Sequence, residues 1–208
     1  MKDKEIERLN TLKEIENNLY KQGLNYIAGI DEAGRGPLAG PVVVGIAIMA
    51  PDSFIEGVND SKKISEKKRE ALYQKIIDEA VDWSVGIVDQ KEIDEINILN
   101  ATKKALTIAI KNLKIKPERI LVDALEHIDT CQIPYTSIIK GDAKAYSISA
   151  ASIIAKVTRD RIMREYDEIY PQYGFAKHKG YGTAEHMKAI REYGACPIHR
   201  KSFIKNIV

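Results

Sequence analysis

Cysteine is scarce in this sequence of 208 residues, which contains only Cys131 and Cys196. The two are far apart and form no Cys-x-x-Cys pair, so they indicate neither a disulfide framework nor a zinc site, and a reducing cytoplasm is the simplest setting. Long apolar runs are lacking as well: the longest, 42–50, is interrupted by Gly45 and is too short to span a bilayer. The charged first ten residues contain no apolar segment typical of a signal peptide. We therefore expect a cytoplasmic protein without a membrane partner.

Common nucleotide and zinc motifs are missing too. The sequence has no Walker A motif, no dinucleotide-binding fingerprint and no HExxH spacing among its four histidines. The net charge is only +2, yet residues 139–208 carry 13 basic and 7 acidic side chains, a net charge of +6. This basic C-terminal third favours a phosphate-rich partner, while solvated helix faces explain the excess equally well.

The order of apolar segments predicts an α/β layered domain around a mixed sheet. Strands are expected at 26–30, 42–49, 81–88, 120–122 and 137–139. Helices are expected at 3–21, 65–80, 93–113 in two pieces, 145–169 and 183–193, with Ser65 and Thr183 as N-caps. The first helix precedes the first strand, so we interpret residues 1–22 as an N-terminal helical appendage and residues 23–208 as the main domain.

Asp31 and Glu32 are the first candidate functional residues. They follow the apolar segment 26–30 and precede a Gly-rich loop. Two neighbouring carboxylates repel each other and resist desolvation unless a cation holds them. Neighbouring side chains of a strand point to opposite faces, so both reach one site only if the strand ends there, which Gly34 permits. Taken alone, an Asp-Glu pair is more often a pair of surface charges.

Two further carboxylates belong to apolar segments. Asp123 directly follows the strand 120–122, and strand tips are where α/β sheets bind ligands, although a turn or capping aspartate explains it as well. Asp160 falls on the apolar stripe of the long helix, where a lone carboxylate needs a partner. The alternative for Asp160 is an ion pair with Lys156 or Arg164. Four carboxylates without histidine or cysteine suit Mg²⁺ or Mn²⁺ and in-line phosphoryl displacement with two ions.

Two Gly-rich segments offer groups that bind nucleic acid. Gly34-Arg35-Gly36 directly follows the acidic pair, and its glycines let the backbone approach a ligand, but a simple turn has the same composition. The segment 177–183, KHKGYGT, combines cations and glycines with Tyr181, which can lie flat against a sugar or base. The alternative is a flexible basic loop with Tyr181 packed inward.

Together, six segments resemble the ribonuclease HII family. They are GIDEAGRGPLAGPVV at 29–43, NDSKKIS at 59–65, VDA at 122–124, KGDAKAYSISAASIIAKVTRDR at 140–161, YPQYGFAKHKGYGT at 170–183 and HRKSF at 199–203. They follow the order typical of the family and cover most of the chain. Two features depart from it. Ala124 stands where many members have glycine, and residues 202–208 lack the sliding-clamp-binding peptide of some archaeal members.

The resemblance implies an RNase H-like mixed five-stranded sheet flanked by helices, with a helical C-terminal part. It implies an endoribonuclease that hydrolyses the RNA strand of RNA–DNA hybrids and cuts 5′ to single ribonucleotides in duplex DNA, leaving 3′-hydroxyl and 5′-phosphate ends. The implied catalytic and metal-binding residues, which hold two Mg²⁺ or Mn²⁺ ions with substrate, are Asp31, Glu32, Asp123 and Asp160. The implied substrate-binding residues are Gly34, Arg35, Gly36 and Tyr181, with Lys62, Ser149 and Lys156 near substrate phosphates.

Two rival functions stay open on the sequence alone. A type HIII-like enzyme needs runs of ribonucleotides, and the Gly-Arg-Gly triplet argues against it because that type typically lacks the arginine. A non-catalytic module that binds hybrids gains nothing from carboxylates that face phosphates. The expected partner is an RNA–DNA hybrid or a DNA duplex with an embedded ribonucleotide, bound by a monomer without a clamp partner.

Overall fold

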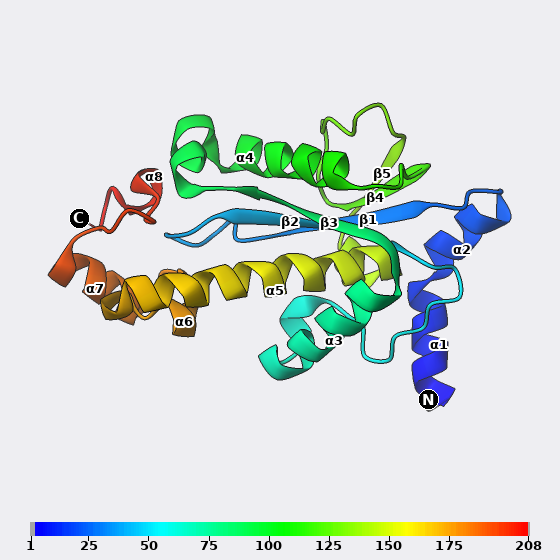
Figure 1. The fold of residues 1–208 in the computed structure, drawn as a ribbon, viewed down its shortest axis with the longest axis horizontal. Coiled ribbons are helices and arrows are strands. Elements are labelled where there is room, and N and C mark those ends of the chain that lie inside the picture. Colours follow the sequence, from blue (N-terminus) through cyan, green and yellow to red (C-terminus); the bar gives the residue numbers. More distant parts are fainter. Residues whose placement is uncertain (1–2, 208) are drawn as a thin grey trace.

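A five-stranded mixed sheet forms the centre of the structure, a computed structural model that describes residues 3–207 (Figure 1). The strands are β1 (Ile27–Ala33), β2 (Val42–Met49), β3 (Ala80–Val88), β4 (Arg119–Asp123) and β5 (Tyr135–Ile138), in the order β3-β2-β1-β4-β5. β1, β2 and β3 form an antiparallel meander, whereas β4 runs parallel to β1 and β5 runs parallel to β4. The predicted α/β fold with a mixed sheet is confirmed. Residues 1, 2 and 208 of the predicted domain ranges lie outside the described part.

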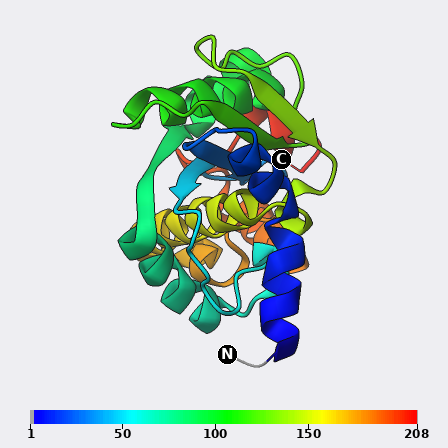
Figure 2. The ribbon, with the colours of Figure 1, turned by 90° about the vertical axis from the view of Figure 1, so that its right-hand side faces the viewer.

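Helices cover both faces of this sheet. They are α1 (Asp3–Leu12), α2 (Glu14–Lys21), α3 (Glu66–Glu79), α4 (Gln90–Asn112), α5 (Tyr146–Ile169), α6 (Phe175–His178), α7 (Ala184–Tyr193) and α8 (Lys201–Ile204), with 3-10 turns at Ser61–Lys63, Gly141–Ala143 and Pro171–Tyr173. Figures 1 and 2 show α4 on one face of the sheet and α5 on the other, with α3 packed beside α5. Within residues 3–207, no helix is long and apolar enough to cross a membrane.

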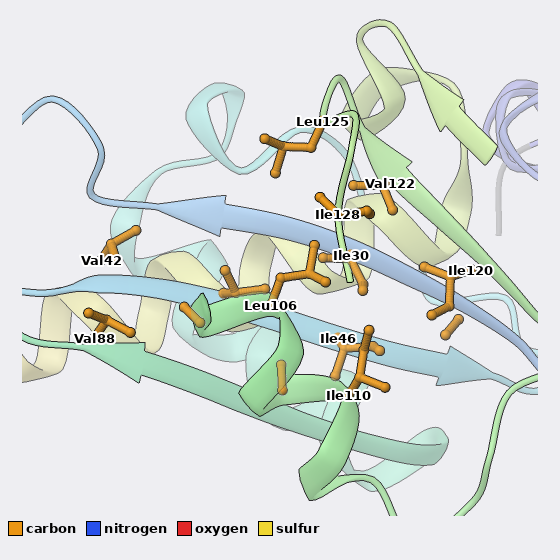
Figure 3. Close-up of a cluster of buried hydrophobic side chains, with 14 of the residues drawn as sticks. Ile30, Val42, Ile46, Val88, Leu106, Ile110, Ile120, Val122, Leu125 and Ile128 are labelled. Atoms are coloured by element: carbon orange, nitrogen blue, oxygen red, sulfur yellow. The ribbon is translucent and has the colours of Figure 1, made fainter. Parts of the chain in front are cut away.

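The two faces of the sheet bury separate apolar clusters. Side chains of β1, β2 and β4 such as Ile30, Ile46 and Val122 pack against Leu106 and Ile110 of α4 (Figure 3). On the other face, a second cluster joins β2 to α3 and α5. Because both faces are covered, every residue of β2 is buried, which explains its unbroken apolar sequence.

Most predicted elements lie within a few residues of those observed. Three differences matter: the end of β1, the division of the first helix, and the missing side-chain cap at Ser65. β1 continues to Ala33 and so includes both acidic residues, where the strand was expected to end before them. The first predicted helix is two helices that meet at Lys13. The two pieces expected within α4 are confirmed, because Asn97 interrupts the helix with φ 66° and ψ 163°. Thr183 caps α7 as predicted, whereas Ser65 makes no side-chain cap.

The N-terminal helices are joined to the rest of the fold by buried polar contacts. The ammonium of Lys13 donates hydrogen bonds to the carbonyl oxygens of Pro51 and Ser53, at 2.6 and 2.7 Å. The carboxylate of Glu16 accepts hydrogen bonds from the backbone N–H and the hydroxyl of Ser147, at 2.8 and 2.7 Å. Glu16 thereby satisfies one free N–H group in the first turn of α5. The division of the chain into an appendage and a main domain stays a prediction.

α5 lies against β1 and β2 at backbone contact distance because glycines of the sheet face it. A Cβ atom added at Gly29 would lie 2.1 Å from the carbonyl carbon of Ser147 and 2.2 Å from the nitrogen of Ile148. A Cβ atom at Gly45 would lie 2.5 Å from the carbonyl oxygen of Ala151. Only glycine permits this approach, so these two positions set the height of α5 above the sheet.

We expect Gly29→Ala to lower the free energy of unfolding by at least the about 1–3 kcal/mol typical of an overpacked core, because the added methyl group meets rigid backbone. Urea unfolding measures the change. Gly36→Ala is the matched control, since its added Cβ would meet nothing closer than 3.8 Å. Equal stability of the two variants would contradict the proposed contact.

Candidate metal and nucleic-acid site

Three aspartates from three segments bring their carboxylates together at the ends of β1 and β4. They are Asp31 of β1, Asp123 at the last position of β4, and Asp142 in the turn before α5. One carboxylate oxygen of each lies within 4.8 Å of the others. The parallel pairing of Ile30 with Val122 makes Asp31 and Asp123 the next neighbours along the two strands, on the same face. We call these three residues the acidic group.

The acidic group is electrostatically unfavourable by itself. Burial raises the pKa of Asp31 well above its usual range, and the charges of Glu32 and Asp123 raise it further. Burial also raises the pKa of Asp142, followed by the charges of Asp60 and Asp123. A divalent cation removes this repulsion, and carboxylate oxygens are the ligands that Mg²⁺ and Mn²⁺ prefer, so the donor set fits either ion.

Glu32, next to Asp31 on β1, adds a further carboxylate to the same cleft. Strand alternation places Asp31 and Glu32 on opposite faces of β1, yet both line one cleft of about 530 Å³. β1 ends one residue after Glu32, at Ala33, and at this end of the strand both side chains reach the cleft. The carboxylate of Glu32 lies 3.3 Å from the guanidinium of Arg35, and burial raises its pKa while Arg35 lowers it.

The structure does not bring Asp160 into the acidic group. Its carboxylate is buried and accepts a hydrogen bond from Lys156 at 2.5 Å, and its other oxygen lies 3.5 Å from the guanidinium of Arg69 on α3. The ion pair with Lys156 was the alternative left open by the sequence, whereas Arg164 pairs with glutamates of α3. Lys156 itself lines the cleft, so Asp160 holds the ammonium group of Lys156 at the edge of the cleft.

Sequence reasoning misses Asp142, although it lies in a segment that carries the resemblance. It follows β5 after the left-handed residue Lys140, in the same strand-tip setting as Asp123. The N–H of Gly141 donates to the carboxylate of Asp123 at 2.7 Å, which joins the two aspartates. Ser149 is fully buried, and its hydroxyl donates to the carbonyl oxygen of Asp142 at 2.7 Å. The structure thus gives Ser149 a supporting position under this turn, away from solvent.

The other predicted substrate-binding residues lie around the same cleft. It is lined by the predicted residues Asp31, Glu32, Gly34, Arg35, Gly36, Lys62, Lys156 and Tyr181. The ring of Tyr181 is 45% exposed, so it does not pack inward. The ammonium of Lys62 lies 3.7 Å from Asp142. Burial lowers the pKa of Lys62, but the charges of Asp31 and Asp142 outweigh burial and raise it. Acidic and basic groups therefore face one another across the cleft.

Two buried arginines hold the Gly-Arg-Gly loop from behind. Arg200 donates hydrogen bonds to the carbonyl oxygens of Gly34 and Arg35, at 2.6 and 3.0 Å. Arg159 donates to the carbonyl oxygens of Pro41, at 3.0 Å, and Lys179, at 2.9 Å, and so joins this loop to the Tyr181 segment. Within residues 3–207, neither guanidinium forms an ion pair.

This arrangement directs the peptide N–H groups of the loop away from the buried arginine. In a trans peptide, the N–H points away from the C=O of the preceding residue. Since Arg200 binds the carbonyl oxygens of Gly34 and Arg35, the N–H groups of Arg35 and Gly36 point away from Arg200. Burial lowers the pKa of Arg200 to about 9, which shows how little its charge is compensated. Donors and uncompensated positive charge together favour an anion at this loop.

Comparison with known proteins decides between the open families. Residues 28–206 match the family model described as Ribonuclease HII. The chain belongs to the ribonuclease HII family. It is 58% identical over 206 residues to the ribonuclease HII of Acetivibrio thermocellus, covering 99% of this chain and 80% of that protein. The ribonuclease HII of Clostridioides difficile is 58% identical over 207 residues, with the same coverage. The predicted family and enzyme class are confirmed.

A solved relative supports the fold of this family member. The ribonuclease H2 from Pyrococcus horikoshii OT3 aligns with a TM-score of 0.73 and 34% sequence identity, covering 88% of this chain and 96% of that one. The predicted RNase H-like sheet with flanking helices is therefore confirmed, including the helical part that follows α5.

The alanine that departs from the family pattern is conformationally strained. Ala124 has φ 44°, in the left-handed region that favours glycine. Its N–H donates to the carbonyl oxygen of Ile138 at 3.2 Å, which keeps β4 and β5 together beyond their last paired residues. The substitution leaves Asp123 in the acidic group and stores its strain directly beside it.

Asparagine substitutions separate the role of Asp142, in the turn before α5, from that of Asp160, within α5. We expect Asp142→Asn to weaken Mn²⁺ binding by about tenfold or more, since even indirect partners of a metal site contribute that much. Asp160→Asn should keep Mn²⁺ affinity but lower the free energy of unfolding by about 3 kcal/mol, because Arg69 and Lys156 lose a buried partner. Titration calorimetry and urea unfolding measure the two effects. The reverse pattern would return Asp160 to the metal site.

Proposed function

We propose that the chain is an endoribonuclease that hydrolyses the RNA strand of RNA–DNA hybrids and cuts 5′ to single ribonucleotides in duplex DNA. One observation carries the proposal: Asp31, whose carboxylate lies with those of Asp123 and Asp142, lines the same cleft as the Gly-Arg-Gly loop and Tyr181. Metal-binding carboxylates thus lie beside groups suited to a sugar and its phosphate. Membership of the ribonuclease HII family supports the same reaction.

Asp31, Asp123 and Asp142, with Glu32 beside them, are the residues that would hold Mg²⁺ or Mn²⁺. Bound there, two such ions would supply the positive charge that activates an attacking water and stabilises the leaving oxygen, which would leave 3′-hydroxyl and 5′-phosphate ends. The chain itself binds and orients the substrate. Asp142 replaces Asp160 in the proposed metal site because its carboxylate lies with the other two.

Each remaining part of the cleft has a task in this proposal. Lys62 and Lys156 attract backbone phosphates. The N–H groups of Arg35 and Gly36 bind oxygen atoms beside the scissile bond, where the 2′-hydroxyl distinguishes RNA from DNA. Tyr181 lies against the sugar. Its position opposite the loop is supported by the added Cβ of Gly36, which would meet the Tyr181 ring at 3.8 Å.

The two rival functions account for the cleft less well. A type HIII-like enzyme has no use for Arg35, which is present and pairs with Glu32 at the cleft. A module that only binds hybrids would be weakened by three clustered carboxylates with mutual repulsion, since they repel phosphates as well. An enzyme that reads single ribonucleotides uses both features.

The deciding experiment is cleavage of a DNA duplex that contains one ribonucleotide, with and without Mg²⁺. We expect metal-dependent cleavage on the 5′ side of the ribonucleotide, and at least about 100-fold less with Asp142→Asn, because removing one stabilising group from a catalytic site costs that much. Cleavage of an all-RNA hybrid strand alone would favour the HIII-like enzyme. Tight binding without cleavage at saturating Mg²⁺ or Mn²⁺ would favour the binding module.

Arg35→Ala and Tyr181→Ala test substrate reading. Neither belongs to the acidic group, so Mn²⁺ affinity should be unchanged. Loss of the Tyr181 ring removes stacking of about 1–3 kcal/mol. The substrate with one ribonucleotide has a single 2′-hydroxyl to bind, so its cleavage rate should fall more than the rate on a long RNA–DNA hybrid. Equal losses on both substrates would mean that these residues only bind the backbone.

A further inference from the structure

Three buried histidines surround the segment that carries Tyr181. His178, His186 and His199 are 8%, 0% and 3% exposed, respectively. The rings of His178 and His186 stack with centroids 4.4 Å apart, and Phe175 packs edge-on against His186. None of the three lines the cleft, and the proposed reaction uses none of them. Buried imidazoles need partners for both nitrogens, and each of these finds them.

The backbone determines which nitrogen of His199 carries the proton. The N–H of Cys196 donates to Nδ1 of His199 at 2.9 Å. An amide nitrogen always carries its hydrogen, so Nδ1 is an acceptor and the proton of the neutral ring is on Nε2. The sulfur and carbonyl oxygen of Cys196 also lie near this nitrogen, at 3.1 and 3.3 Å. They do not change the assignment, because Nδ1 uses its lone pair to accept the N–H of Cys196 and carries no hydrogen to donate.

The opposite assignment follows for His186. Its Nε2 lies 3.0 Å from Nε2 of His199, which carries a hydrogen, so Nε2 of His186 accepts. Its Nδ1 then carries the proton and donates to the carbonyl oxygen of Tyr181 at 2.9 Å. The carbonyl oxygen is an acceptor only, so both ends require the same result. Hydrogen bonds therefore run in one direction, from Cys196 through His199 and His186 to Tyr181. We call this chain the histidine relay.

His178 holds the residue next to Tyr181 in the same way. The N–H of Gly180 donates to Nδ1 of His178 at 3.2 Å, and Nε2 of His178 therefore donates to the carbonyl oxygen of Tyr173 at 2.7 Å. Gly180 has φ 83°, so the chain turns sharply directly before Tyr181. The N–H of Thr183 also donates to the carbonyl oxygen of Tyr181, at 2.8 Å.

Both relay rings are neutral at neutral pH. Burial lowers the pKa of His186 to about 4, and burial also lowers the pKa of His199. A second proton on either ring would place two N–H donors face to face at the 3.0 Å contact. The relay therefore has one arrangement of hydrogens and one orientation for the Tyr181 carbonyl.

We propose that the histidine relay positions Tyr181 for reading the ribose, which makes His186 and His199 positioning residues for substrate specificity. The inference rests on the proposed function, because it assumes that Tyr181 contacts the sugar. Two hydrogen bonds to one carbonyl oxygen fix the peptide that follows the Tyr181 side chain. The guanidinium of Arg159 lies over the Tyr181 ring, 6.0 Å from its centroid, and the relay adds a fixed peptide orientation to this contact on a Gly-flanked segment.

The tautomers are directly measurable by ¹⁵N NMR of the imidazole rings in the free protein at neutral pH. We expect His178 and His199 to carry the proton on Nε2 and His186 to carry it on Nδ1. Exposed His127 is the internal reference. A proton on Nε2 of His186, or a cationic His186, would overturn the relay whatever the enzyme cleaves.

Two matched pairs of variants test the link to specificity. The amide of asparagine reaches the position of Nδ1, and that of glutamine reaches the position of Nε2. At position 186 the bond to Tyr181 uses Nδ1, so His186→Asn should keep the preference for the single-ribonucleotide substrate and His186→Gln should lower it about tenfold, equivalent to 1.4 kcal/mol. At position 199 the bond uses Nε2, so His199→Gln should keep the preference and His199→Asn should lose it.

Opposite preferences at the two positions, asparagine at 186 and glutamine at 199, distinguish a positioning role from a packing role. A merely structural role predicts that loss follows side-chain volume at both positions and that the ratio of rates on single-ribonucleotide and hybrid substrates stays at the wild-type value. That unchanged ratio in all four variants, with melting temperatures above the assay temperature, would overturn the proposal. If one pair does not fold, the other pair still gives the order. Failure of the wild-type protein to cut single ribonucleotides would instead contradict the proposed function, and the NMR result would stand apart from it.

Discussion

The backbone contact between α5 and the glycines of β1 and β2 is the constraint on which the site depends. α5 is one helix of 24 residues, and it contacts several of the segments that form the cleft and the acidic group. Its first turn holds the segment with Asp142, its middle presents Lys156, and Arg159 binds the loop that follows β1. Because Gly29 fixes the distance between α5 and the strand of Asp31, these groups reach the cleft at set positions.

Charges that are unfavourable in isolation gather around this cleft. Asp31 and Glu32, whose pKa values are raised, line it, and Arg159 and Arg200, which form no ion pair within residues 3–207, hold the loop beside it. Folding alone does not favour either arrangement, because both bury charge. A ligand that brings divalent cations and phosphates together compensates both at once. Such unpaired charge is characteristic of sites that stabilise a bound ligand at the expense of the free protein.

Apolar periodicity predicts the strands and long helices, because burial on one or two faces leaves a repeat in the sequence. The strand-tip argument likewise finds Asp123. Asp160 shows the limit. Its burial on an apolar stripe is correctly predicted, but its partner Arg69 lies on α3, and only the packing of α3 against α5 reveals that contact. Asp142 lies in an aperiodic turn, and resemblance alone does not say which aspartate of a segment points to the metal. The sequence does not predict the roles of Arg159 and Arg200 either, because they bind backbone carbonyl oxygens and such contacts require no particular residue type at the partner position.

The bonds between Arg200 and the loop at Gly34 join residues 166 positions apart. Contacts of such long sequence separation form late, because most of the chain must be ordered before they close. During synthesis the acidic group and the Arg159 contact can form once α5 has emerged, yet Gly34 and Arg35 gain their hydrogen bonds to Arg200 only after that residue has left the ribosome. A nascent chain therefore brings the acidic group together before Arg200 adds its hydrogen bonds to the loop beside that group.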